Sequence, residues 1–288
     1  MKFLYFVQIS VFVLIFPKPS DSLNITLDKD GRRYEIDIEK YIEGVVSGEI
    51  PESWPDETIK AQAVVSRSYA LYIYNNERKI IRGDTRDQVW KQKTSTRISR
   101  LVGETRGWVL LFQDGSIAPG FFHSTCGGTT ENAWEMWGGD RRLDEIVSVR
   151  CTKCYESPLF FWKKRIKIEE IRKYSKKQDD PLYDKIMEIS DIPKNNLIYI
   201  EKSSSGRAIK FFFLDTMNIL HYRDIRDILP SNFFEYEIFG DTIQFYGRGW
   251  GHGVGMCQWG AKRLAEEGFN WKDIIRFYFP KLQLKKIY

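Results

Sequence analysis

A single isolated carboxylate, Glu49, is the residue best placed for chemistry in this sequence. It lies in "VVSGEIPESW", where Ile38, Ile42, Val45 and Glu49 follow one another at helical spacings of 4, 3 and 4. An acid on an apolar helix face loses hydration of its charged form, so its pKa should rise, which suits a general acid near neutral pH. The competing interpretation is a glutamate that turns to solvent at the end of the helix.

Two cations follow on the next helical segment. Lys60 and Arg67 are seven residues apart and therefore share one helix face, two turns from each other. They are predicted to hold an anionic ligand beside Glu49, with a solvated helix face as the alternative. That alternative is stronger for Lys60, because Arg67 has small and apolar neighbours.

The cysteines indicate a metal site. "HSTC" (His123, Cys126) and "CTKC" (Cys151, Cys154) form two clamps of the kind that bind tetrahedral zinc. A closed site of four ligands would be structural. Disulfides 126–151 or 126–154 and free buried thiols are the alternatives, and Cys257 is expected to be a small buried residue outside the site.

A glycine-rich segment, "GRGWGHGVGMCQWG", lacks the spacing of a dinucleotide or phosphate loop. His252 and Gln258 are its candidate substrate-binding side chains, and Trp250 and Trp259 could stack on sugars or belong to the core. "DTRDQVW" offers Gln88 and Asp87, either as groove residues or as turn-forming side chains.

These residues need helices and hairpins to position them. A helix is expected from Asp37, as N-cap, to Pro51. A second is expected to start around Ser53 to Asp56, with Ser53 as N-cap, and to run to about Asn75. Hairpins are expected around Asp114-Gly115 and in "AIKFFFLDTMNILHYR", then a strand, glycine loop and helix at 242–268 and a last helix in "NWKDIIRFYFPKL". The pattern predicts an α+β fold with a charged, helical subdomain inserted at about 156–240.

Composition excludes some classes. The 288 residues carry a net charge of +5 with cations and anions interspersed, which argues against nucleic-acid binding. Residues 1–22 combine Lys2, a short apolar run and a small-x-small pattern at Ser20 and Ser22, as in a signal peptide. An exported protein is therefore expected, in the periplasm, in the cell wall or at the outer face of the cytoplasmic membrane. The alternative is an uncleaved anchor, which would be its only membrane contact.

The stretch "GVVSGEIPESWPDETIKAQAVVSRSYALY" resembles the signature of the stage II sporulation protein D family, which includes amidase enhancers. The resemblance continues in family order through "DTRDQVW", "ETRGWVLLF", "FHSTCGGTTEN", "SSSGRAIKF" and "GRGWGHGVGMCQWGAKRLAEEG". It implies a protein active on peptidoglycan glycan strands, with Glu49 in the position of the catalytic acid and Lys60 and Arg67 in positions of substrate contacts.

The resemblance implies a lytic transglycosylase that cleaves MurNAc–GlcNAc bonds, with denuded strands as the expected substrate, and leaves 1,6-anhydro-MurNAc ends. No cofactor is required for that chemistry, and zinc would be structural. A second interpretation is a non-catalytic, peptidoglycan-binding enhancer of an N-acetylmuramoyl-L-alanine amidase. A third, a zinc hydrolase built on His123 and the cysteines, would need an open coordination position, whereas four protein ligands close the site.

Overall fold

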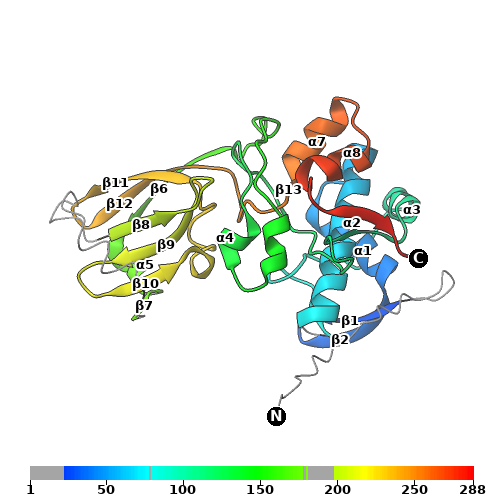
Figure 1. The fold of residues 1–288 in the computed structure, drawn as a ribbon, viewed down its shortest axis with the longest axis horizontal. Coiled ribbons are helices and arrows are strands. Elements are labelled where there is room, and N and C mark those ends of the chain that lie inside the picture. Colours follow the sequence, from blue (N-terminus) through cyan, green and yellow to red (C-terminus); the bar gives the residue numbers. More distant parts are fainter. Residues whose placement is uncertain (1–22, 78, 178–179, 181–197) are drawn as a thin grey trace, which may run out of the picture.

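The computed structural model describes residues 23–77, 79–177, 180 and 198–288. A helical part and a strand-rich lobe lie side by side, with the short helix α4 (Ala133–Trp137) between them (Figure 1). Among the described residues, no helix is both long and apolar enough to cross a membrane. The predicted signal segment, residues 1–22, lies outside the described residues.

Helix α1 (Ile38–Glu49) confirms the first predicted helix. The side chain of Asp37 caps it by accepting hydrogen bonds from the backbone N–H groups of Glu39 and Lys40. Ile50 is extended, with φ −134° and ψ 153°, as expected for a residue that precedes proline. The helix therefore ends at Glu49, and the carboxylate stands at its last turn.

Helix α2 (Asp56–Tyr72) begins at the end of the predicted range, but Ser53 is not its cap. Pro55 occupies the N-cap position, where its fixed φ suits a helix start. The small residues of α2 permit close packing, and the hydroxyl of Ser68 accepts a 2.9 Å hydrogen bond from the backbone N–H of Leu110. A π-helical turn, Ile73–Glu77, extends α2.

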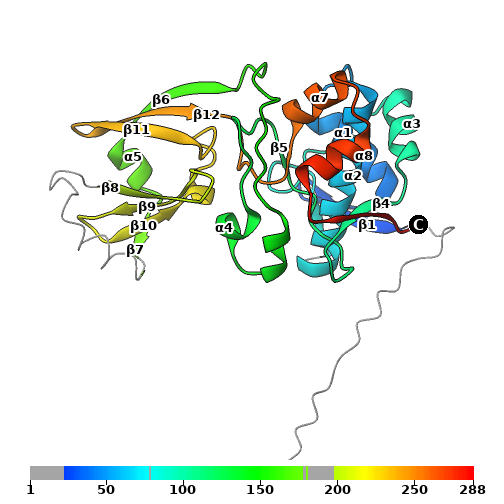
Figure 2. The same ribbon diagram turned by 45° about the horizontal axis from the view of Figure 1, so that its top comes forward.

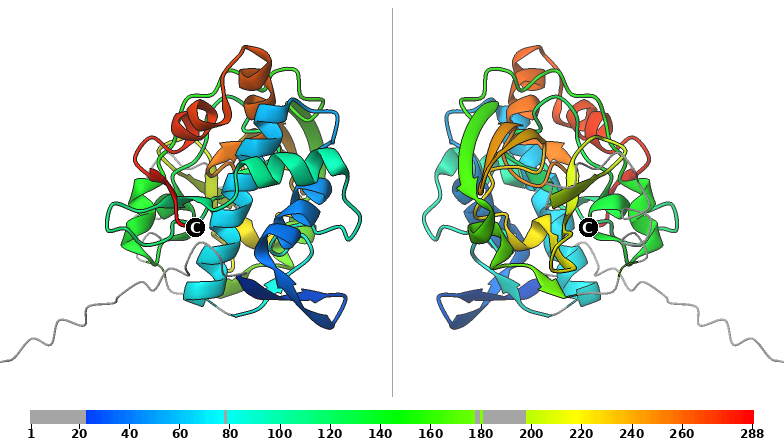
Figure 3. Two further views of the ribbon diagram at one scale, coloured as in Figure 1. Left: turned by 90° about the vertical axis from the view of Figure 1, so that its right-hand side faces the viewer. Right: turned by 90° about the vertical axis from the view of Figure 1, so that its left-hand side faces the viewer.

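The other helices and the strands of this part surround α2. Figure 3 shows the dark-blue β1–β2 hairpin at the lower edge of these helices and α7 and α8 at the top. The elements are β1 (Asn24–Lys29), β2 (Arg32–Asp37), β3 (Ile81–Arg82), α3 (Thr96–Glu104), β4 (Trp108–Leu111), α7 (Gln258–Glu266), α8 (Trp271–Tyr278) and β14 (Gln283–Lys286). Strand β4 pairs with β14, which brings the chain end back onto the core.

The hairpin predicted around Asp114-Gly115 is only partly correct. The turn forms, since the backbone N–H of Phe112 donates to Ser116 O at 2.9 Å. No regular second strand follows, because Pro119 lacks an N–H and Gly120 passes so close to α2 that a Cβ would lie 2.1 Å from Val65 O. Instead β5 (Phe122–His123) pairs in parallel with β13 (Met256–Cys257).

The strand-rich lobe contains two antiparallel sheets, one above the other in Figure 2. One has the order β11-β12-β6 and the other β7-β10-β9-β8. Their elements are β6 (Phe161–Lys167), α5 (Ile168–Arg172), β7 (Lys176–Lys177), β8 (Ile198–Lys202), β9 (Ala208–Phe213), β10 (Asn218–His221), β11 (Phe234–Phe239) and β12 (Thr242–Arg248). The β9–β10 pair confirms the second predicted hairpin.

The helical character predicted for 156–195 is wrong for the described residues, where α5 spans only five residues. The charged run at 161–167 is a strand because all seven residues pair with β12, and this pairing outweighs a weak helix propensity. The boundaries of the inserted subdomain stay a prediction. The α+β class is confirmed by the mixture of helices and antiparallel sheets.

Candidate active site

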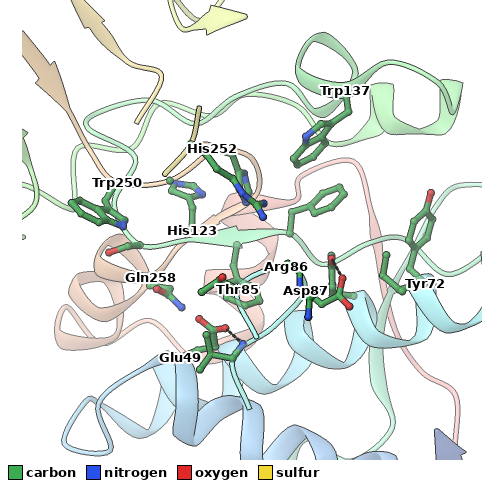
Figure 4. A pocket seen from close by; sticks show the side chains of 18 of the residues that line it. Glu49, Tyr72, Thr85, Arg86, Asp87, His123, Trp137, Trp250, His252 and Gln258 are labelled. Carbon is green, nitrogen blue, oxygen red and sulfur yellow. Dashed lines mark hydrogen bonds between the residues drawn. The ribbon is translucent and has the colours of Figure 1, made fainter. Parts of the chain in front are cut away.

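A groove of about 820 Å³ lies between the helical part and the segments that lead to the strand-rich lobe. We call it the Glu49 groove (Figure 4). It is rich in aromatic side chains and contains both acids and cations. The side chains that line it include those of Glu49, Tyr69, Tyr72, Arg86, Asp87, Phe121, His123, Trp137, Asp140, Arg226, Trp250, His252 and Gln258.

Glu49 enters the groove from the C-terminal end of α1. The backbone N–H of Val89 donates a 2.6 Å hydrogen bond to its Oε1. Oε2 has no hydrogen-bond partner among the described residues. Burial raises the pKa of Glu49 to about 7, and the Val89 hydrogen bond opposes that rise. The group can therefore carry a proton, or accept one, near neutral pH.

Two glycines of α1 allow the chain around Val89 to lie against the helix. A Cβ on Gly48 would lie 2.2 Å from Val89 O, and one on Gly44 would lie 2.1 Å from the indole nitrogen of Trp90. The backbone N–H of Lys91 also donates to Gly44 O at 3.0 Å. The Gly-x-x-x-Gly spacing before Glu49 thus positions the donor that contacts the carboxylate.

Two neutral histidines form another wall of the groove. His123 Nδ1 is 3.1 Å from Val254 O, an acceptor, so this nitrogen carries the proton and the buried, unpartnered Nε2 is an acceptor. His252 Nδ1 accepts a 3.0 Å hydrogen bond from Val254 N. Burial lowers the pKa of His252 to about 4 and that of His123 well below its usual value. Neither ring is charged at neutral pH.

The predicted groove residues of the glycine-rich segment divide into two groups. His252 and Gln258 line the groove, and Gln258 donates a 3.3 Å hydrogen bond to Gln62. Trp250 also lines it and keeps 45% of its surface exposed. Trp259 does not line it, because its ring packs edge-to-face on Trp54 at 5.3 Å between ring centroids.

The structure does not place Lys60 or Arg67 at the groove, which corrects both predictions. Lys60 forms ion pairs with Glu57 at 2.9 Å and Glu104 at 2.8 Å. Arg67 is fully buried and contacts both carboxylate oxygens of Glu39, at 2.9 and 2.6 Å. Lys60 and Arg67 therefore pair with acidic side chains of the protein itself and do not face a ligand-binding surface.

Gln88 is also displaced from its predicted role. It is 1% exposed, accepts a hydrogen bond from Tyr41 Oη at 3.1 Å and donates to Ser66 O at 3.3 Å. These contacts hold the 84–90 loop against α1 and α2. The loop presents its neighbours Asp87 and Arg86 to the groove instead.

Of the four predicted metal ligands, the structure brings Cys126, Cys151 and Cys154 together, but His123 does not join them. The sulfurs of Cys126, Cys151, Cys154 and Cys257 all lie within 4.8 Å of one another, and all four residues are buried. His123 lines the groove instead, and its Nδ1 lies 3.1 Å from Val254 O. Pairing of β5 with β13 sets Cys257 opposite His123 in register and adds the fourth sulfur.

Sequence reasoning missed three participants. The Val89 N–H is a backbone group, so it cannot be identified as a donor from the type of residue. Trp137 comes from α4, and Arg226 comes from the strand-rich lobe. Arg226 is exposed and forms no ion pair within the described ranges. Only the approach of three distant segments brings these groups to Glu49, although the residue types of Trp137 and Arg226, a tryptophan and a cation, carried a weak signal for sugar binding.

The fold and the groove define an α+β protein with one proton-carrying carboxylate in an aromatic cleft. The family model described as "Stage II sporulation protein" matches residues 29–112, and a domain of unknown function matches 140–255. Stage II sporulation protein D of Bacillus subtilis is 30% identical over 273 residues, which cover 87% of this chain and 75% of that protein. The chain belongs to the stage II sporulation protein D family.

Two further relatives extend the comparison. An uncharacterised protein of Brachyspira hyodysenteriae is 30% identical over 264 residues, 85% of this chain and 66% of that protein. The amidase enhancer of Bacillus subtilis is 24% identical over 285 residues, 83% of this chain but 39% of that protein. The chain thus spans about two thirds of the first relative's length and a smaller part of the second's.

Proposed function

We propose that this protein is an exported lytic transglycosylase that cleaves MurNAc–GlcNAc bonds in peptidoglycan glycan strands, with Glu49 as its general acid and base. The observation that carries the proposal is the position of Glu49 in the groove with a pKa of about 7. A carboxyl with that pKa is divided between its acid and base forms at neutral pH, as a group with both roles must be.

The reaction needs one carboxyl group. Protonated Glu49 donates its proton to the glycosidic oxygen as the bond from that oxygen to C1 of MurNAc breaks. The resulting carboxylate removes the proton from the 6-hydroxyl of the same MurNAc, whose oxygen attacks C1 and closes the 1,6-anhydro ring. Glu49 thereby regains its proton. Since the nucleophile belongs to the substrate, the second carboxylate of an ordinary glycosidase is not required.

The remaining groove residues suit a glycan. Trp137 and Trp250 offer flat faces for sugar rings. His123 Nε2 offers a buried acceptor for a hydroxyl or an acetamido N–H, a group that a sugar supplies. Arg226 has the charge to bind a lactyl carboxylate of a denuded strand, the role that the sequence had suggested for Lys60 and Arg67.

The test is product analysis. The purified protein is incubated with denuded strands and with intact peptidoglycan, and the chain ends are identified by mass spectrometry. We expect 1,6-anhydro ends, lost in Glu49→Gln and retained in Glu52→Gln, a matched control whose exposed side chain lies outside the groove. Ordinary reducing ends would identify a hydrolase instead.

A second candidate is a non-catalytic enhancer of a cell-wall amidase. It is favoured by the similarity to the Bacillus subtilis amidase enhancer. In that case the groove would bind strands without cleaving them, and the protein would stimulate an added N-acetylmuramoyl-L-alanine amidase. Binding and stimulation without any cleavage, unaffected by Glu49→Gln, would establish this function and refute the transglycosylase.

A further inference from the structure

Four thiols from three distant chain segments meet behind the wall of the Glu49 groove. Cys126 follows β5, Cys151 and Cys154 lie in one loop, and Cys257 caps the N-terminus of α7. Their sulfurs all lie within 4.8 Å of one another, and those of Cys126 and Cys154 are 3.4 Å apart. Ligands about 2.3 Å from a tetrahedral zinc lie about 3.8 Å from each other, so the spacing fits one ion.

Each sulfur already receives a hydrogen bond of the kind that stabilises a thiolate. Backbone N–H groups of Cys126 and Gly260 donate to Cys257 Sγ at 3.3 and 3.4 Å, and that of Gly128 donates to Cys126 Sγ at 3.4 Å. Tyr278 Oη lies 3.2 Å from Cys151 Sγ, and Gly127 supplies a backbone hydrogen bond to Cys154. Such outer contacts orient and tune metal ligands.

Close packing at Gly260 allows helix α7 to approach the four cysteine sulfurs. A Cβ on Gly260 would lie 2.1 Å from Tyr278 Oη and 2.8 Å from Cys151 Sγ. A glycine at this position therefore lets the first turn of α7 approach the cluster. The backbone N–H of Gly260, in that first turn, then points at the Cys257 sulfur.

The buried cation Arg207, which lies beside the four cysteines, would be stabilised by negative charge on their sulfurs. Arg207 is fully buried and donates hydrogen bonds to the carbonyl oxygens of Cys126 and Thr129 and to Asn232. It forms no ion pair with any residue that the structure describes. A zinc ion with four thiolates carries a net charge of −2, whereas two disulfides carry none. The buried carboxylate of Glu131 interacts electrostatically with Arg207, and a cluster charge of −2 would add to this stabilisation of the guanidinium, whereas two neutral disulfides would not.

We propose that Cys126, Cys151, Cys154 and Cys257 bind one structural zinc ion. Four protein ligands leave no open coordination position, so the ion does not take part in catalysis. It joins β5, the loop at 151–154 and the start of α7, and therefore fixes the groove wall that carries His123 and Gln258. The proposal is independent of whether the groove cleaves or only binds glycan.

The test is the metal content and spectrum of the purified full-length protein. We expect one zinc per chain by mass spectrometry, four thiols that become titratable only after chelation, and the intense visible bands of a tetrahedral cobalt thiolate after exchange with Co²⁺. Removing the metal should lower Tm. Stoichiometric iron in place of zinc would overturn the assignment of the ion, and a metal-free protein with no titratable thiols would overturn the site in favour of disulfides.

Two variants test whether Cys257 or His123 is the fourth zinc ligand. Cys257→Ser should lose zinc or bind it at least about 10-fold more weakly, and its cobalt form should lose one thiolate charge-transfer contribution. His123→Gln should retain one zinc and an unchanged cobalt spectrum. The reverse result would place His123 in the site and refute the tetrathiolate. Should Cys257→Ser fail to fold, the thiolate count from the wild-type cobalt spectrum decides between three and four sulfurs.

Discussion

The backbone N–H of Val89 donates a 2.6 Å hydrogen bond to Oε1 of Glu49, across 40 residues of sequence. This contact stabilises the carboxylate, while burial stabilises the protonated acid. Burial is the larger effect, and the balance leaves the pKa at about 7. The opposing effects of burial and of the Val89 hydrogen bond therefore set how the protonation of Glu49 depends on pH.

Activity should fall as pH rises through about 7. The protonated form of Glu49 starts the reaction, and its fraction declines tenfold per pH unit above the pKa of about 7. The measurement is kcat/KM for anhydro-end formation between pH 5 and 9. Burial lowers the pKa of His252 to about 4 and that of His123 well below its usual value, so neither histidine should add an inflection near pH 7. A rate that keeps rising to pH 9 would contradict the role of Glu49 as acid.

Glu49→Gln should stabilise the protein at high pH. The pKa of Glu49 is about 7 in the folded state and 4.5 unperturbed, so between these values the folded protein keeps a proton that the unfolded chain has lost. Stability therefore falls as pH rises from about 4.5 to 7. Removing the carboxylate should raise the free energy of unfolding by about 1 to 3 kcal/mol at pH 8 and hardly at all at pH 4. Denaturant unfolding at both pH values measures this, and equal effects at the two would refute it.

Gly48→Ala should reduce activity by about 10- to 100-fold, because its Cβ would meet Val89 O at 2.2 Å and push the donor away from Glu49. Gly103 provides a matched control in helix α3, since nothing lies within 4 Å of a Cβ there. Gly103→Ala should leave activity unchanged and stabilise the protein by about 0.5–1 kcal/mol. Steady-state rates and thermal unfolding of both variants are compared. Equal activity in the two variants would show that the close approach at Gly48 is unimportant.

Arg67→Met should lower the free energy of unfolding by about 3–5 kcal/mol, because it leaves Glu39 buried without its cation. Lys60→Gln should cost less than about 1 kcal/mol, since its ion pairs are only partly buried. Urea denaturation separates the two variants, and neither should change KM in the folded fraction. A normally stable Arg67→Met protein with a raised KM would restore Arg67 as a substrate contact.

Arg226→Gln should raise KM for denuded strands by about 2- to 10-fold with little change in kcat, since Arg226 lies at the groove but not at the reacting bond. The salt dependence of strand binding should also weaken. Arg276→Gln, an exposed arginine of α8, is the matched control and should change neither quantity. An unchanged KM in Arg226→Gln would remove this residue from the substrate site.

The sequence by itself determined the local elements that carry the candidate groups. The 4-3-4 spacing of α1, the Asp37 cap and the stop before Pro51 placed Glu49 at the last turn of a helix. The glycine-rich segment likewise connected a strand to the helix that begins at Gln258. Periodicity, caps and proline act within a few residues, so a single sequence displays them directly.

Tertiary structure decided which distant groups meet. The same helical spacing that put Lys60 and Arg67 on one face could not show that Glu57, Glu104 and Glu39 neutralise them. The short H-x-x-C spacing favoured His123 as a ligand. In the structure β5–β13 pairing instead brings Cys257 to Cys126, 131 residues away in the sequence, and His123 lines the groove. Burial and long-range pairing set charge, pKa and ligand sets, and these depend on how segments pack rather than on the order of residues within any one of them.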